Sequence, residues 1–424
     1  MMALLVVGVF LLSIAAGVPI AFSLGFSALA YLLVAGVPVA VIPQTMFAGL
    51  DSFVMLAIPA FILAGNLMNA GGITNRIIDF ANALVGHIRG GLALTNVASS
   101  LGFGGISGTA LSDTASIGSV MIPAMKKQGY GSGFSAAVTS ISSTVGPMLP
   151  PSLPMIIIGT LASISIGDLF VAGAIPGVVL GIGFLFVTYL ISVKRKYPKG
   201  RRHSVSEVGK SFFGAFWALL MVVIILWGIL GGYFTPTEAA VVVVFYAFIV
   251  GKFVYKELDL KEVPGIMMDT LRTTASILIL VALANTFGWI LVAEGVPILV
   301  ADVILSITEN PILITLLMIL LLLIVGMFME TIAAIVILFP VLLPIADSIG
   351  MDPIHFSIIM VLALMIGLST PPVGVCLFVA SQFANVKIMT TVKELVPYFV
   401  ISIIVLIIVA FVPSLSLFLP SLFE

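Results

Sequence analysis

Two proline-rich stretches interrupt long apolar runs of this sequence. The first is STVGPMLPPSLP, residues 143–154, and the second is GLSTPPVG, residues 367–374. The runs around them are long enough to cross a bilayer, which takes about 20 apolar residues per helix. Proline lacks an amide donor and clashes with the preceding turn, so a helix ends or bends there. Because unpaired backbone is tolerated at membrane depth only inside the protein or beside water, the two breaks predict an internal polar site.

The composition agrees with a chain embedded in a membrane. Of the 424 residues, 61% are hydrophobic and only 8% are charged, whereas a soluble domain carries about 25% charged residues. The long apolar runs lack the alternation of an outer-membrane barrel. We therefore expect an all-α polytopic membrane protein. The single cysteine, Cys376, excludes an internal disulfide and a cysteine-ligated metal cluster.

Ten apolar segments are predicted to cross the membrane. Their approximate ranges are 3–17, 20–36, 51–69, 130–163, 172–193, 212–231, 237–251, 271–293, 355–386 and 395–413. The first lacks a basic region before it and is expected to be a retained span rather than a signal peptide. Two further segments, 91–125 and 311–345, are interrupted near the middle by small or charged residues. They are predicted to be re-entrant hairpins.

Lysine and arginine predict the orientation of these segments. When the basic loop KRKYPKGRRH, residues 194–203, is placed in the cytoplasm, every lysine and arginine falls on that side. The outward loops then carry only acids, among them Asp168, Asp347 and Asp352. If either hairpin crossed the membrane instead, later loops would change sides and this separation would be lost. The charge pattern thus predicts ten crossings, two opposed hairpins and both termini outside.

Glycines and prolines recur after a shift of 221 residues. The matching pairs are Gly105 and Gly326, Pro123 and Pro344, Gly129 and Gly350, Gly146 and Gly367, Pro150 and Pro371, Pro151 and Pro372, and Pro176 and Pro397. By the charge pattern, the two copies have opposite orientations. Inverted repeats with broken helices are typical of secondary transporters, whose substrate site lies near the midplane. The alternative is that membrane helices are rich in glycine and proline in any case.

Each break is expected to present backbone groups to a ligand. Pro151 and Pro372 are predicted to begin second half-helices, whose free amide groups attract an anion. Ser152 adds a hydroxyl to the first of them. The preceding half-helices end with unpaired carbonyls, which together with the hydroxyls of Thr144 and Thr370 suit a hard cation such as sodium.

The predicted hairpin tips carry the remaining polar residues. Their sequences are GFGGISGTALSDTASIG, residues 102–118, and GMFMETIAA, residues 326–334. Asp113 and Glu330 are the only acids that this topology places at membrane depth, where an ionisable residue is costly and by default functional. The alternative is a structural role for either acid. For Asp113 that role would be a cap on the second hairpin arm, since SDTA is typical of a helix start.

Two segments of mixed polarity, residues 73–89 and 252–270, are predicted to be amphipathic helices at the cytoplasmic interface. The chain then divides into five parts. These are scaffold helices of repeat 1 (1–70); an interfacial arm, hairpin and broken helix of the transport domain (71–193); a basic cytoplasmic loop (194–211); scaffold helices and interfacial arm of repeat 2 (212–270); and the second hairpin and broken helix of the transport domain with the C-terminal helix (271–424).

Six motifs together resemble the large membrane subunit of tripartite ATP-independent periplasmic (TRAP) transporters, in the ion-transporter superfamily of elevator carriers. They are GGISGTALSDTASIG, GPMLPPS, FTPTEAA, GMFMETIAAI, LPIADSIGMDPIHF and IGLSTPPVG. The resemblance covers essentially the whole chain. It implies sodium-driven import of an organic acid anion, such as sialic acid or a C4-dicarboxylate, across the bacterial inner membrane. The implied partners are a periplasmic substrate-binding protein and a small membrane subunit, expected as a separate chain because this one starts at the first span of the large subunit.

The resemblance also implies site residues. The first sodium site would comprise Ser107, Gly146, Leu149 and Pro151. The second would comprise Gly326, Gly367, Thr370 and Val373. The substrate region would comprise Thr109, Asp113 and Glu330, to which we add Ser152 because of its hydroxyl at the first break. Sodium, as the coupling ion, is the expected cofactor; membrane lipid is an expected partner and nucleic acid is not.

Other classes of protein fit the sequence less well. A single-component sodium/carboxylate symporter of the same superfamily is the main alternative, since it would share the hairpins. A proton-driven antiporter would need more buried acids or histidines. An enzyme is not expected, because the spans contain no HExxH motif, metal-binding acidic cluster or Ser/Lys nucleophile pair, and the chain has no P-loop. A channel is disfavoured because opposed hairpins suit alternating access.

Overall fold

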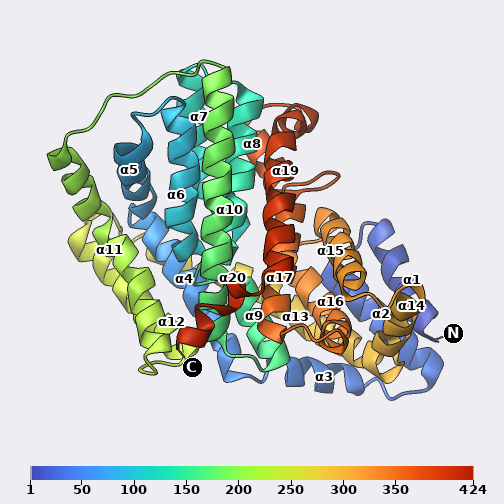
Figure 1. Ribbon diagram of the computed structural model, residues 1–424. Coiled ribbons are helices and arrows are strands. Elements are labelled where there is room, and N and C mark those ends of the chain that lie inside the picture. Colours follow the sequence, from blue (N-terminus) through green and yellow to red (C-terminus); the bar gives the residue numbers. More distant parts are fainter. Residues whose placement is uncertain (1, 424) are drawn as a thin grey trace.

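The computed structural model describes residues 2–423, apart from the side chains of residues 3, 4, 301, 302 and 304–307. Within this part, the regular structure is helical except for one isolated bridge between Arg89 and Lys199. In Figure 1 the long helices α10 (Ile166–Lys194) and α19 (Ile388–Phe411) stand upright, while α3 (Val41–Leu50) lies across the lower edge of the view. The basic loop after α10 crosses the opposite edge. An all-α polytopic fold is thus confirmed.

The first half of the chain runs from α1 to α10. Its other helices are α1 (Met2–Ala15), α2 (Ile20–Ala35), α4 (Ala57–Ala70) after a 3-10 turn at Phe53–Leu56, α5 (Ile73–Val85), α6 (Gly91–Ser107), α7 (Ala110–Lys127), α8 (Ser132–Ser142) with a 3-10 turn at Ser143–Met148, and α9 (Leu153–Ala162). The helix pair α6–α7 is the first predicted hairpin. The pair α8–α9 is the first predicted broken span.

The second half repeats this order. Its helices are α11 (Val205–Leu230), α12 (Pro236–Ile249) with a π turn at Val250–Val254, α13 (Val263–Ala293), α14 (Val296–Ile307), α15 (Pro311–Phe328), α16 (Thr331–Ser348), α17 (Pro353–Gly367), α18 (Val375–Ala384), α19, and the short α20 (Ser414–Leu417) before a turn at Pro420–Leu422. Adding 221 to the bounds of α7 gives the bounds of α16. The predicted repeat is therefore present at the level of whole helices.

Local sequence explains several helix starts. Ser204 and Glu207 form a reciprocal capping box at the start of α11, and Thr235 and Glu238 form another at α12. In each box the hydroxyl accepts from an amide of the first turn while the carboxylate accepts from the cap residue's own amide. Pro236 occupies the first turn of α12, where its missing amide is no loss. The FTPTEAA motif thus encodes a helix start.

Some predicted elements are wrong. Residues 252–270 are not one interfacial helix: the chain turns after the π turn, and the long α13 begins at Val263 because Pro264 suits a first helical turn. The repeat makes α14 the counterpart of α5, so the amphipathic partner of 73–89 lies later in the chain. Neither α3 nor α14 was predicted, since both are short and adjoin longer apolar runs. Several spans are longer than predicted; α10, for example, begins at Ile166 instead of 172.

The double prolines also lie differently from the prediction. The half-helices begin not at Pro151 and Pro372 but at Leu153 and Val375, and both Pro–Pro peptide bonds are cis. Ser152 is the N-cap of α9, because its Oγ accepts from the amide of Met155 at 3.3 Å. The prolines thus form the turn between two half-helices. In the first break the second half-helix, α9, starts at a side-chain cap, whereas α18 starts after Gly374 without one.

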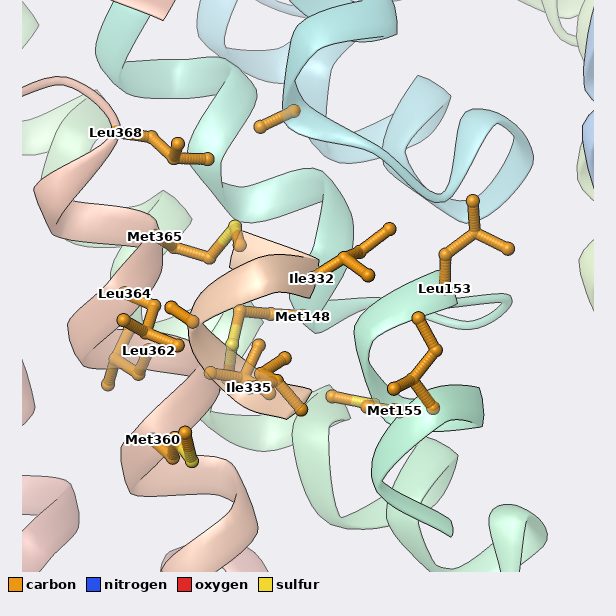
Figure 2. Packing of buried hydrophobic residues seen from close by; sticks show 14 of the residues in the cluster. Met148, Leu153, Met155, Ile332, Ile335, Met360, Leu362, Leu364, Met365 and Leu368 are labelled. Atoms are coloured by element: carbon orange, nitrogen blue, oxygen red, sulfur yellow. The ribbon is translucent and has the colours of Figure 1, made fainter. Parts of the chain in front are cut away.

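The broken helices lie at the centre of the molecule. Nine apolar helical segments of the described chain are at least 18 residues long, and in the broken segment Ser132–Ala162 78% of the residues of the most apolar window are buried, against 28% in α11. Figure 2 shows Ile332, at the start of α16, between Met365 of α17 and Leu153 of α9. The second hairpin therefore packs against both broken helices, which keeps their interrupted backbone away from lipid, as the lack of water there requires.

Candidate functional site

The tip of the first hairpin lies against the first break. Gly108 adopts a left-handed conformation (φ 66°), and a Cβ there would lie 2.8 Å from the carbonyl oxygen of Pro151. The amide of Leu153 donates to the carbonyl of Gly108 at 3.4 Å. Glycine is needed at this position both for the backbone conformation and for the close approach. The structure thus brings together the tip and the double proline.

Asp113 lies fully buried behind this tip. Its Oδ1 accepts a hydrogen bond from the hydroxyl of Ser107, whereas its Oδ2 has no hydrogen-bond partner among the described residues. The predicted alternative, a cap on α7, is wrong: Thr109 is the N-cap and accepts from the amide of Ser112 at 3.3 Å. A buried carboxylate oxygen without a partner is costly, so this atom is a candidate ligand for a cation.

Gly146 leaves room for the Asp113 carboxylate because it has no side chain. A Cβ on Gly146 would lie 2.2 Å from Asp113 Oδ2 and 3.3 Å from the Cα of Gly104. In the same turn, the amide of Leu149 donates to the carbonyl of Gly146 at 2.9 Å. The absence of a side chain at Gly146 therefore lets the acid reach the backbone of the break. Of the residues predicted for the first sodium site, Ser107 and Gly146 surround one carboxylate, with Leu149 and Pro151 in the adjoining turn.

The second tip meets the second break in the corresponding way. A Cβ on Gly367 would lie 2.4 Å from the carbonyl carbon of Gly326. The amides of Val373 and Gly374 donate to the carbonyl of Met327 at 3.3 and 3.4 Å. Thr370 Oγ1 donates to the carbonyl of Ile366 at 2.7 Å. The four residues predicted for the second sodium site thus belong to one contact between a tip and a break.

The two predicted sodium sites differ in the ligands that they offer. The first has a carboxylate with an unpartnered oxygen, which fits a monovalent cation well. The second has backbone carbonyls and the Thr370 hydroxyl, whose lone pairs remain available because it acts as the donor to Ile366. Oxygen ligands of both kinds suit a hard cation.

Glu330 is the N-cap of α16. Its Oε2 accepts from the amides of Ile332 at 2.8 Å and Ala333 at 3.3 Å, so the structural alternative holds for this acid. The side chain is nevertheless exposed, and it faces a cavity of about 330 Å³. Glu330 therefore caps a helix and is also accessible to a ligand.

The cavity lies between the two tips, the two breaks and α13. Its lining residues are Thr109, Ala110 and Leu111 of the first tip; Pro147 and Pro154 beside the first break; Glu330, Thr331 and Ile332 of the second tip; Met365, Leu368, Val375 and Cys376 beside the second break; and Thr273, Ser276, Ile277 and Leu280 of α13. Pockets for small molecules occupy some 300–1,000 Å³ and combine an apolar wall with a few polar groups. This cavity has both properties.

The structure places the predicted substrate residues in two groups. Thr109 and Glu330 line the cavity, whereas Asp113 and Ser152 are fully buried beside it. Sequence reasoning missed the contribution of α13, where the exposed hydroxyls of Thr273 and Ser276 face the cavity. The available signal was the polar stretch DTLRTTAS, residues 269–276, at the start of an otherwise apolar span, in which Thr273 and Ser276 lie at helical spacing.

Comparisons with known proteins give a consistent result. A family model described as "Tripartite ATP-independent periplasmic transporter, DctM component" matches residues 7–415. The chain is 43% identical to the sialic acid TRAP transporter large permease protein SiaM of Vibrio cholerae, over 96% of either chain. It is 42% identical to the isethionate TRAP transporter permease protein DctMQ of Oleidesulfovibrio alaskensis, over 97% of this chain and 65% of that protein. Among solved structures, the Alcanivorax borkumensis YdaH transporter aligns over 88% of both chains with a TM-score of 0.60 and 15% identity, a likeness of fold.

Proposed function

The chain belongs to the DctM component family of tripartite ATP-independent periplasmic transporters, and from this premise we propose that it is the permease of a sodium-coupled importer of an organic acid anion. The large permease is a multi-pass membrane protein, not an enzyme. We assign it to the bacterial inner membrane, where a small membrane subunit and a periplasmic substrate-binding protein would be its partners. The substrate would be a carboxylate of the size of sialic acid or a C4-dicarboxylate.

One observation carries this proposal: both tips, both breaks and α13 meet at a single cavity. A substrate bound there contacts both repeats at once. The hydroxyls and tip amides orient a carboxylate, while the apolar wall excludes water from the rest of the ligand. A site at the interface of two inverted repeats is what alternating access requires.

Sodium coupling is supported by the position of Asp113 beside the first break. Ser107, Asp113 and the backbone around Gly146 would hold one sodium ion, and the second break with Thr370 would hold another. Each ion would bind ligands from a hairpin tip and from the break of the same repeat, and would so complete the adjoining wall of the substrate cavity. Sodium binding would then raise the affinity for the substrate, and by linkage the substrate would raise the affinity for sodium by the same factor.

We further propose that the hairpins and broken helices move together as a transport domain. The remaining long helices would form the scaffold that this body slides against. We include α13 among them, although the sequence-based division placed most of it, from residue 271 on, with the transport domain. The mixed composition of the cavity wall supports this division, because α13 alone supplies its third side. Movement of the transport domain along α13 would carry the substrate cavity from one depth in the membrane to another.

Uptake into proteoliposomes tests the proposed function. The chain is purified with its small membrane subunit, reconstituted, and supplied with a radiolabelled organic acid and an inward sodium gradient. We expect uptake that requires both sodium and the binding protein. Sodium-dependent uptake without the binding protein would instead identify a single-component symporter, and uptake that ignores the sodium gradient would refute sodium coupling.

A further inference from the structure

The two tips present different chemistry to the same cavity at positions related by the repeat. Adding 221 to Thr109 gives Glu330, and both residues are the N-cap of the second helix of their hairpin. Both line the cavity. One tip therefore offers a hydroxyl where the other offers a carboxylate. The two ends of the cavity thus differ in the ligand groups that they favour.

The start of α16 is already occupied by an acidic side chain of the protein itself. Glu330 Oε2 accepts hydrogen bonds from two amides of the first turn of α16, those of Ile332 and Ala333. The first amides of a helix have no partner within the helix and carry its positive end. Since the Glu330 carboxylate satisfies them, this tip has little left to attract a carboxylate of a substrate.

The start of α7 is different. The side-chain oxygen of Thr109, Oγ1, accepts only from the amide of Ser112, which leaves the amides of Ala110 and Leu111 without a capping side chain. Both of these residues line the cavity. Asp113 also lies in the first turn of α7, and the sodium ion proposed beside it would offset the charge of that carboxylate. The uncapped amides and the positive end of α7 then give a substrate carboxylate its best place in the cavity.

The charge of the cavity wall agrees with this polarity. Among the residues that line it, Glu330 is the one acid, and none is lysine, arginine or histidine. Because Oε2 is used by the helix, Oε1 remains as an acceptor for a ligand. Next to it, Thr331 is 2% exposed, lines the cavity, and its Oγ1 has no hydrogen-bond partner among the described residues. This end of the cavity therefore fits hydrogen-bond donors and repels a second anion.

We propose that the substrate is a monocarboxylate with hydroxyl, amide or ammonium donors at its other end. Its carboxylate binds at the amides of Ala110 and Leu111, and its donors face Glu330 Oε1 and Thr331 Oγ1. A compact dicarboxylate is rejected, because its second carboxylate would face the carboxylate of Glu330 across a cavity whose described lining is largely apolar and contains no basic residue. This proposal rests on the proposed function, since it concerns the ligand of the same site.

The test compares two probes on purified permease, with its small subunit, by calorimetric titration in sodium buffer of fixed ionic strength. Sialic acid represents the hydroxylated monocarboxylates and succinate the C4-dicarboxylates. We expect the wild type to bind sialic acid more tightly than succinate. In Glu330→Gln, we expect sialic acid to bind more weakly and succinate to bind roughly tenfold more tightly than in the wild type, because a like charge has been removed.

Asp352→Asn is the matched control. Asp352 caps α17 in the same manner, since its Oδ1 accepts from the amides of Ile354 at 2.8 Å and His355 at 3.2 Å, but it is not among the residues that line the cavity. We expect this variant to change neither affinity. Opposite changes for the two probes cannot arise from a weakened helix cap, which would lower both affinities together.

Two results of the titration would overturn the inference. One is that the wild type binds succinate as tightly as sialic acid or more tightly. The other is that Glu330→Gln shows no gain in succinate binding, whether or not succinate binding to the wild type is measurable. Sodium-driven uptake of succinate in preference to sialic acid would overturn this inference alone, whereas uptake without any sodium dependence would refute the proposed coupling.

Discussion

Replacing Gly146 by alanine tests whether the Asp113 carboxylate binds sodium. The added Cβ would lie 2.2 Å from Asp113 Oδ2, whereas a carbon and an oxygen in close contact are roughly 3.3 Å apart. The carboxylate must therefore move by about 1 Å, the difference between these two distances. Asp113 is fully buried and Ser107 holds its other oxygen, so this displacement has nowhere to go without disturbing the tip.

A shift of this size exceeds what an ion site tolerates. Ligand distances at metal sites hold to about 0.2 Å, so the variant loses Asp113 as a direct ligand. We expect the half-saturating sodium concentration for uptake to rise roughly tenfold, which corresponds to about 1.4 kcal/mol. Overpacking a buried site also costs about 1–3 kcal/mol of folding stability, so the unfolding temperature should fall even without sodium.

The assay measures thermal unfolding of the detergent-solubilised protein and uptake in proteoliposomes, both as a function of sodium concentration. Alanine at Gly265 and at Gly288 is the control, since a Cβ at either position meets nothing within 4 Å. Both control variants should keep the sodium dependence of the wild type. If the Gly146 variant unfolds at a lower temperature but retains the wild-type sodium dependence, Asp113 has a structural role and the assignment of the first sodium site is refuted.

Three other predictions concern the second sodium site, docking and motion. Thr370→Val removes a hydroxyl from the second break and should raise the half-saturating sodium concentration. Thr315→Val is the control, because it too loses a hydrogen bond from its hydroxyl to the carbonyl one turn earlier, and it should leave the sodium dependence unchanged. Equal sodium dependence in both variants would exclude Thr370 as a ligand. Charge reversal of the exposed Asp347 should slow substrate delivery by the binding protein at low salt. The effect should be smaller at high salt, because salt screens the electrostatic attraction between the two proteins. Unaltered uptake at low salt would remove this residue from the docking surface. A cysteine pair at Thr109 and Ser276, which line the same cavity from the tip and from α13, should stop uptake when a bifunctional thiol reagent joins the two across the cavity in a background without the native cysteine. Full transport by the crosslinked protein would refute sliding of the tip along α13.

The sequence predicted the breaks because their signal is local. A double proline ends a helix whatever surrounds it, and the glycine and proline pattern repeats without reference to packing. The exact start of each half-helix could not be predicted in the same way. In the first break the start depends on Ser152, whose hydroxyl caps the helix only in the folded chain, whereas the second half-helix of the other break begins after Gly374 without a side-chain cap.

The roles of the two membrane acids show where sequence reasoning ends. Composition and topology singled out Asp113 and Glu330 because so few charges lie at membrane depth. The sequence suggested a cap for Asp113, yet the structure makes Thr109 the cap, because the turn at Gly108 starts the helix earlier. It is Glu330 that caps its helix. Which oxygen stays without a partner depends on contacts between segments far apart in the chain.

The sequence by itself determined the membrane class, the repeat, the tips and the broken helices, because apolar length, proline and glycine act on their own neighbourhood. Only the tertiary structure decided that Asp113 lies against Gly146, that Thr109 and Glu330 face one cavity, and that α13 closes it. These are contacts between residues more than 30 positions apart, and none has a local signal in the chain. They exist because polar backbone and carboxylates in a membrane must find their partners inside the protein, and the packing of two inverted halves determines which partners are within reach.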